Sequence, residues 1–178
     1  MSARIHDVVD SPIGPLTLVW GGDALRGCFV HDQRERPDDP TFGRLGHAAE
    51  LDAVARQLEE YFAGERRTFD DIPVEPGGTA FRSAVWAALR EVPYGETTSY
   101  GALARAVGAA NGANPVSILV PCHRVVASSG RVVGDGPGPR RKRRLQAFEL
   151  GLEDLTPDAV RVASSTTQWP ASQPLAGR

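Results

Sequence analysis

The spacing of hydrophobic residues over the first part of the chain predicts a small antiparallel sheet with one helix packed on it. Apolar or β-branched runs occupy residues 4–9, 16–20 and 25–30, and the turn-forming clusters D-S-P-I-G-P and G-G-D-A separate them. A polar loop that contains prolines follows. Residues 48–62 then carry apolar side chains at helical spacing and end before a glycine. We expect these segments to form an N-terminal α/β domain over residues 1–75.

A second, mainly helical domain is expected over residues 76–155. The prolines and glycines of I-P-V-E-P-G-G interrupt regular structure, so this segment is interpreted as the linker between the domains. Thr79 is a suitable N-cap for the first helix of this domain. Trp86 lies beside the apolar stripe of that helix, which consists of Phe81, Val85, Leu89 and Val92.

Two further helices are predicted in the second domain. The run T-T-S-Y-G-A-L-A-R-A-V-G favours a short helix capped by Thr98 or Ser99 and ended by Gly108. Residues 140–150 follow a proline and form the last helix, whose first turns, R-R-K-R-R, are interpreted as a solvated basic face. The apolar positions of these helices are Leu103, Val107, Leu145, Phe148 and Leu152. The fold class is therefore α+β, and the polar residues 156–178 are typical of a disordered tail.

One stretch between these helices, N-P-V-S-I-L-V-P-C-H-R-V-V, combines a buried segment with reactive side chains. Residues 116–120 predict a buried strand that Pro121 ends, and Cys122 and His123 follow at once. A thiolate is a strong nucleophile, and it needs a base or a positive neighbour to form near neutral pH. His123 and Arg124 are the adjacent candidates. The alternative interpretation is that Cys122 is a small buried hydrophobic residue.

The composition is that of an ordinary globular protein, with 41% hydrophobic and 24% charged residues. No apolar run reaches the length of a membrane span, and the first residues lack the pattern of a signal peptide, so we expect a cytoplasmic protein. Cys28 and Cys122 are far apart and form no C-x-x-C pair. A disulfide framework or a cysteine-rich metal site is therefore not expected.

Charge is distributed unevenly along the chain. The net charge is only −2, but residues 1–78 carry 8 Arg against 15 Asp and Glu, whereas residues 79–151 carry 10 Lys and Arg against 4 Asp and Glu. The basic segment contains Cys122 and is the part that could neutralise phosphates.

Several motifs together resemble the O6-alkylguanine-DNA alkyltransferases. The resemblance covers residues 5–152 and includes I-L-V-P-C-H-R-V-V, D-S-P-I-G-P-L-T-L, Y-F-A-G-E and V-P-Y-G-E-T-T-S-Y-G. It implies a monomer that binds double-stranded DNA through a helix-turn-helix and flips O6-alkylguanine, or O4-alkylthymine, out of the duplex. The alkyl group would move irreversibly to cysteine. Because a thioether is stable, we expect one turnover per molecule and neither a cofactor nor a metal.

The resemblance also implies roles for individual residues. Cys122 would be the nucleophile and His123 its base. Neighbours on a strand point to opposite sides, so we expect one water to relay the proton between them. Glu149 would hydrogen-bond His123, and Asn114 would tie the active-site strand to the preceding helix. For DNA, Tyr100 would crowd a phosphate, Arg105 would replace the flipped base, and Arg124 would make a further contact. The pocket for the base would be lined by Val125, Asp135 and Gly136 and by the carbonyl of Cys122.

Two features depart from the family pattern. Asp135 stands where the family usually has a tyrosine, whose hydroxyl is thought to stabilise charge on the leaving guanine. In addition, Arg105 comes only five positions after Tyr100, as if about one helical turn and an inter-helix turn were missing. We therefore expect a truncated helix-turn-helix. These departures favour an alternative function, a non-catalytic module that binds alkylated DNA, although the retained Cys122 counts against it. An unrelated cysteine hydrolase is a third, weaker hypothesis.

The first departure gives a test. Replacing Asp135 by Tyr should speed alkyl transfer, because a hydroxyl would replace a carboxylate that opposes negative charge on the leaving base. Single-turnover kinetics on O6-methylguanine DNA measure the change, and a slower Asp135→Tyr variant would contradict this interpretation of the loop.

Overall fold

The structure is a computed structural model that describes residues 4–33, 36–99, 105–127, 129, 131–132, 138–153 and 155. At Asp39, residues 105–107 and Ala109 it describes the backbone alone. The predicted site residues Tyr100, Asp135 and Gly136, the side chains of Leu103 and Val107, and the tail from residue 156 lie outside this description. None of the described helices is both long and apolar enough to cross a membrane.

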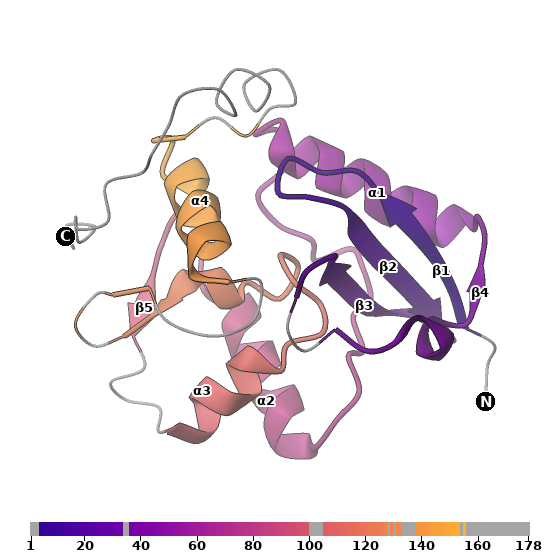
Figure 1. The fold of residues 1–178 in the computed structure, drawn as a ribbon. Coiled ribbons are helices and arrows are strands. Elements are labelled where there is room, and N and C mark those ends of the chain that lie inside the picture. The colour runs from indigo at the N-terminus through magenta and orange to yellow at the C-terminus, as the bar shows by residue number, and fades with distance from the viewer. Residues whose placement is uncertain are drawn as a thin grey trace.

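The N-terminal half is a sheet with one helix across it (Figure 1). The strand order is β3-β2-β1-β4 in the described part of the chain, and β1, β2 and β3 pair antiparallel as predicted. The strands are β1 (Arg4–Val9), β2 (Leu16–Gly21), β3 (Ala24–Val30) and β4 (Arg44–Leu45). A short 3-10 helix, Asp39–Phe42, precedes β4. The parallel pairing of β4 with β1 makes the sheet mixed, and two exposed residues gave no sequence pattern that could predict it.

The helix α1 (Ala49–Phe62) confirms the predicted amphipathic segment. Its buried side chains, which face the sheet and the second half of the protein, are Leu51, Val54, Gln57, Leu58, Tyr61 and Phe62. After the helix the chain returns to the sheet, where Leu25 N donates to Pro73 O at 2.9 Å and Glu75 N donates to Leu25 O at 3.0 Å. The segment interpreted as a linker is therefore fixed along β3. The boundary after residue 75 stays a prediction.

The second half contains α2 (Ala80–Arg90), α3 (Arg105–Gly112) and α4 (Pro139–Glu149). Thr79 caps α2 as predicted, because its hydroxyl accepts from Arg82 N at 3.3 Å. The indole Nε1 of Trp86 donates to Ala110 O at 2.9 Å and so fixes α3 on α2. The predicted apolar stripe is wrong at Phe81, which is 51% exposed because the first turn of α2 lies outside the core that buries Val85 and Trp86.

The predicted helix from Thr98 to Gly108 is wrong at both ends. Thr98–Ser99 form β5, which pairs parallel with β6 (Val125–Val126), so strand pairing overrides the capping preference of these residues. At the other end α3 passes through Gly108 and continues to Gly112, which is possible because one internal glycine costs a helix only about 1 kcal/mol. Residues 100–104 lie outside the described residues, so the expected truncation of the helix-turn-helix stays a prediction.

The segment 116–120 is buried as predicted, but it is not a strand. Val116 forms a single bridge to Cys28 of β3, and the chain then turns at Ile118, whose φ is +73°. The side chain of Asn114 closes this turn, since its Nδ2 donates to Val120 O at 2.8 Å and its Oδ1 accepts from Val116 N at 3.0 Å. A side-chain hydrogen bond thus replaces the ladder that a strand would need.

The last helix, α4, lies close to the predicted range, but two expectations about it are wrong. Leu152 is 67% exposed, because the chain leaves the helix at Gly151, where φ is +70°. The basic first turns are not a solvated face. Lys142 is only 1% exposed, and the guanidinium groups of Arg141 and Arg144 donate to backbone carbonyls of the loop between β1 and β2. These cations hold α4 against the N-terminal half.

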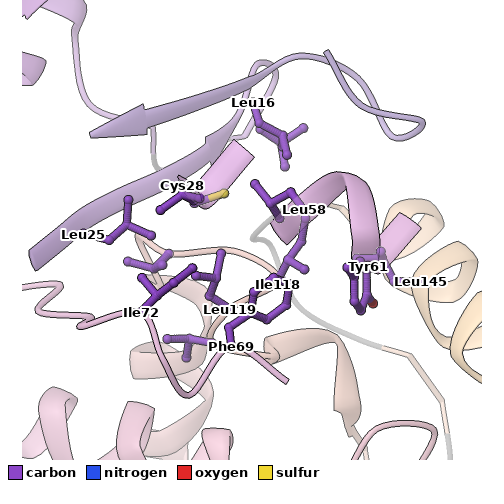
Figure 2. Packing of buried hydrophobic residues seen from close by; sticks show 14 of the residues in the cluster. Leu16, Leu25, Cys28, Leu58, Tyr61, Phe69, Ile72, Ile118, Leu119 and Leu145 are labelled. Carbon is purple, nitrogen blue, oxygen red and sulfur yellow. The ribbon is translucent and has the colours of Figure 1, made fainter. Parts of the chain in front are cut away.

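One hydrophobic core joins the two halves. Figure 2 shows Ile118 and Leu119 of the turn beneath the sheet residues Leu25 and Cys28. On the other side of the cluster, Leu145 of α4 lies beyond the end of α1. The segment that precedes Cys122 is therefore held in place by apolar packing against the sheet, α1 and α4.

The contact between α2 and α3 gives a stability test. Trp86→Phe should lower the free energy of unfolding by about 1–2 kcal/mol, because it leaves the buried carbonyl of Ala110 without its donor. Phe81→Ala on the same helix is the control and should change it by less than about 0.5 kcal/mol, since Phe81 is half exposed. Urea unfolding measures both; equal effects would contradict the proposed anchoring role of Trp86.

Candidate active site

Cys122, His123 and Arg124 form one turn of 3-10 helix that begins directly after Pro121. Arg124 N donates to Pro121 O at 3.0 Å, and Val125 N donates to Cys122 O. Successive side chains on such a turn are about 120° apart rather than on opposite sides. The strand geometry that was expected to separate Cys122 from His123 is therefore absent. All three side chains are buried, with His123 at 0% and Cys122 at 1% exposure.

The carboxylate of Glu149, at the end of α4, is the centre of a buried hydrogen-bond network. Its Oε1 lies 2.8 Å from Nε2 of His123 and accepts from the hydroxyl of Tyr61 at 2.7 Å. Arg124 donates from Nε to Oε2 at 3.0 Å and from Nη2 to Oε1 at 2.9 Å. The amide of Gly95 also donates to Oε2, at 3.2 Å. Donors from both halves of the protein thus meet on one carboxylate.

The surroundings keep Glu149 ionised. Burial by itself would raise the pKa of Glu149, but the hydrogen bond from His123 and the hydrogen bonds and positive charge of Arg124 outweigh it and hold the pKa below its usual range. The effect on His123 is the opposite. Burial lowers the pKa of His123, and the bond to Glu149 only partly compensates, while the charges of Arg124 and Lys142 lower it further. A neutral imidazole beside a carboxylate is the consistent assignment at neutral pH.

This assignment fixes the tautomer of His123. Because a carboxylate only accepts, Nε2 must carry the proton, and Nδ1 is then the acceptor. Nδ1 is buried and has no hydrogen-bond partner among the described residues. Gln146 Nε2 donates to the carbonyl of His123 at 2.6 Å and fixes the backbone behind the ring. The arrangement offers a buried base with one unused nitrogen.

The two cysteines differ sharply in their surroundings. Cys28 is fully buried in the apolar core, and burial raises the pKa of its thiol to about 12. Cys122 instead directly precedes His123 and Arg124 in the same turn. Of the two thiols, Cys122 is the one placed for proton transfer to a base.

Asn114 and Arg124 both have structural roles beside the active-site turn. Asn114 closes the turn that ends at Val120, and its carbonyl accepts from Gln33 of the N-terminal half at 3.2 Å. The buried guanidinium of Arg124 donates to Glu149 and to Val92 O. The expectation that Arg124 contacts DNA stays a prediction.

The remaining predicted site residues are not brought together by the described structure. Val125 lies in β6 beside Thr98, and the backbone of Arg105 begins α3. No contact of the Arg105 side chain is described, so its role and those of Tyr100, Asp135 and Gly136 stay predictions.

Sequence reasoning missed Tyr61, Gln146 and Lys142. A signal existed for two of them: Lys142, Gln146 and Glu149 follow one another at helical spacing and form a polar strip that is entirely buried. No local pattern distinguishes Tyr61 from the other buried aromatic residues of α1.

A possible metal site lies elsewhere. Among the described residues, Asp7, His47 and Asp52 have ligand atoms within 4.8 Å of one another. They are partly or fully exposed, and the ion pair between His47 and Asp7 at 3.2 Å accounts for most of the arrangement.

A cleft of about 490 Å³ borders the candidate active site. Pro121 and Arg124 contribute to its lining, but Cys122 and His123 do not.

Two family models match successive parts of this chain. Residues 5–76 match the ribonuclease-like domain of 6-O-methylguanine DNA methyltransferase, and residues 80–150 match its DNA binding domain.

Curated relatives and solved structures agree with these matches. The methylated-DNA–protein-cysteine methyltransferase of Mycobacterium tuberculosis is 44% identical over 157 residues, which cover 81% of this chain and 91% of the relative. The enzyme of the same name from Haemophilus influenzae is 36% identical over 84% of this chain and 88% of its own length. The crystal structure of Mycobacterium tuberculosis OGT in complex with DNA superposes with a TM-score of 0.76 at 42% identity, over 85% of this chain and 96% of that chain.

The buried network gives a stability test. Glu149→Gln should lower the free energy of unfolding by about 3–5 kcal/mol, because it leaves the buried guanidinium of Arg124 without its counter-charge. Glu65→Gln, at an exposed position, is the control and should have little effect.

The same variant should alter the pH dependence of stability. The pKa of Glu149 is lower in the folded than in the unfolded chain, so its contribution is complete above about pH 4.5 and is lost as the pH falls below that value. Urea unfolding between pH 3 and 7 should show a steeper loss in the wild type than in Glu149→Gln. Parallel curves would show that Glu149 is not held ionised.

Proposed function

Because this chain belongs to the family of 6-O-methylguanine DNA methyltransferases, we propose that Cys122 is the residue that accepts the alkyl group. The protein is a methylated-DNA–protein-cysteine methyltransferase, a DNA repair enzyme that removes O6-methylguanine. The name of the relatives requires a cysteine acceptor, and the chain has two cysteines to choose from. The choice rests on one observation. His123 lies in the same turn as Cys122, and its ring is hydrogen-bonded to the buried carboxylate of Glu149.

For the transfer we propose the following sequence of events. The thiol of Cys122 gives its proton to Nδ1 of His123, directly or through one water, and Glu149 stabilises the imidazolium that forms. The thiolate attacks the methyl carbon, so a carbon–sulfur bond forms as the bond between that carbon and O6 breaks. The electron pair stays on the guanine, which takes up the proton that Cys122 gave to His123, so that guanine and the neutral imidazole are both restored. No step requires a group other than these residues, the water and the DNA.

The product explains why each molecule would act once. A thioether has no leaving group that His123 or Glu149 could displace, so Cys122 would remain alkylated. The repair would be stoichiometric, with one alkyl group per chain.

For the partner we propose double-stranded DNA that contains O6-alkylguanine, bound by a monomer in the cytoplasm. Support comes from the basic segment 79–151 and from the relative whose structure contains DNA. α3 is fixed on α2 by Trp86 and is the candidate helix for the DNA surface. We propose O4-alkylthymine as a second substrate, because the same attack by Cys122 would remove its alkyl group.

A non-catalytic module that binds alkylated DNA is the alternative. The short connection between β5 and α3 and the carboxylate at Asp135 favour it. The Cys122, His123 and Glu149 arrangement favours transfer, because a module that only binds DNA has no need of a buried base beside a thiol.

The test compares the two cysteines. Cys122→Ser should abolish transfer of a labelled methyl group from O6-methylguanine DNA to the protein, whereas Cys28→Ser should retain one methyl per chain, because only Cys122 adjoins a base. Peptide mass spectrometry then locates the methyl group.

His123→Gln should slow the transfer about 100-fold or more, since general-base assistance is lost. Labelling of Cys28 in the wild type would contradict the assignment. Binding of alkylated DNA without any labelling would instead establish the non-catalytic alternative.

A further inference from the structure

Tyr61 is the one side chain of the N-terminal half that donates a described hydrogen bond to the Glu149 carboxylate. It lies near the end of α1 and is fully buried. Figure 2 shows it at that end of α1, with Leu145 of α4 beyond it. Its hydroxyl donates to Oε1 of Glu149 at 2.7 Å, and this is the same oxygen that Nε2 of His123 approaches at 2.8 Å.

The ring of Tyr61 is held from several sides, so the direction of its hydroxyl is fixed. Aromatic neighbours from four segments surround it with centroid distances of 5.2 to 6.0 Å: Phe62, Phe69, Tyr94 and Phe148. Burial, followed by the charge of Glu149, raises the pKa of Tyr61, so the phenol remains a neutral donor. A rigid neutral donor of this kind tunes a carboxylate without adding charge.

We propose that Tyr61 is a positioning residue for alkyl transfer, which acts from the N-terminal half by holding Glu149 and by limiting the negative charge that Glu149 presents to His123. This inference rests on the proposed role of His123 as the base. Without the phenol, Oε1 would attract a proton on the imidazole more strongly. His123 would then become protonated at a higher pH and would lose its function as a base there.

Other charges also face His123 and Glu149. Lys142 of α4 and Arg124 of the active-site turn both disfavour a protonated His123, and Tyr94 lies near the carboxylate. The Cys122 thiol precedes His123 in the same turn. A change at Tyr61 removes none of these groups, so their effect on the pKa of His123 is the same in Tyr61→Phe as in the wild type.

The experiment compares Tyr61→Phe with Tyr94→Phe in the full chain. Both variants lose one hydroxyl and keep the aromatic ring. In Tyr61→Phe the acid limb of the pH profile for transfer should move up by about half to one pH unit, so that the rate on that limb falls about three- to tenfold. The rate at pH 8.5 should stay close to that of the wild type. Tyr94→Phe should superpose on the wild type. Identical profiles for Tyr61→Phe and the wild type would overturn the proposal, as would a loss of rate that is equal at every pH.

A second measurement separates this inference from the proposed transfer reaction. In the Cys122→Ser background, nitrogen-15 NMR follows the protonation of His123 without any chemistry, and His123→Gln identifies its signals. Tyr61→Phe should raise the pKa of His123. Replacement of the tyrosines by 3-fluorotyrosine, a stronger donor that fills nearly the same space, should lower it and covers the case in which Tyr61→Phe does not fold. An unchanged pKa of His123 overturns the role of Tyr61, whether or not the wild type transfers a methyl group. A shifted pKa together with a wild type that never labels Cys122 supports the coupling and refutes the proposed function.

Discussion

The buried carboxylate of Glu149 is the interaction on which the rest of the site depends. Removing a carboxylate from water is costly unless donors replace the lost hydration. Here Tyr61 of α1, Gly95 after α2, and His123 and Arg124 of the active-site turn supply those donors. These donors come from three different parts of the chain. The carboxylate therefore fixes α4, the turn and the N-terminal half relative to one another, and loss of any donor would leave a charge or a polar group unpaired.

This arrangement links the fold to the chemistry. A carboxylate that is held ionised orients the imidazole and determines which nitrogen carries the proton. The 3-10 turn then places the thiol of Cys122 in the same buried segment, and Asn114 closes the preceding turn so that the segment cannot extend into a strand. Apolar packing of Ile118 and Leu119 under the sheet anchors this geometry from below. The N-terminal half thus supports the reactive half through both its core and Tyr61.

Local sequence patterns were sufficient where an element is decided by its own residues. The three strands, α1, α2 and α4 carry clear periodicities. Cys122 and His123 were predicted from the apolar run that precedes them, and Glu149 was predicted through the family resemblance. Elements decided by distant partners were not predicted. β5 depends on pairing with β6, the turn at 116–120 depends on the side chain of Asn114, and the burial of Arg124 depends on its ion pair with Glu149. The basic cluster of α4 shows the same limit, since the sequence cannot tell a solvated cation from one that donates to a neighbouring loop.

The measurement that tests this account most directly is the protonation state of His123 in the wild-type protein at neutral pH. Two-bond nitrogen–proton correlation spectra distinguish the two neutral tautomers from the imidazolium. The account predicts a neutral ring protonated on Nε2, with a downfield proton on that nitrogen from its bond to Glu149. An imidazolium, or a ring protonated on Nδ1, would contradict it, because Nδ1 would then already carry a proton and could not accept the proton of Cys122.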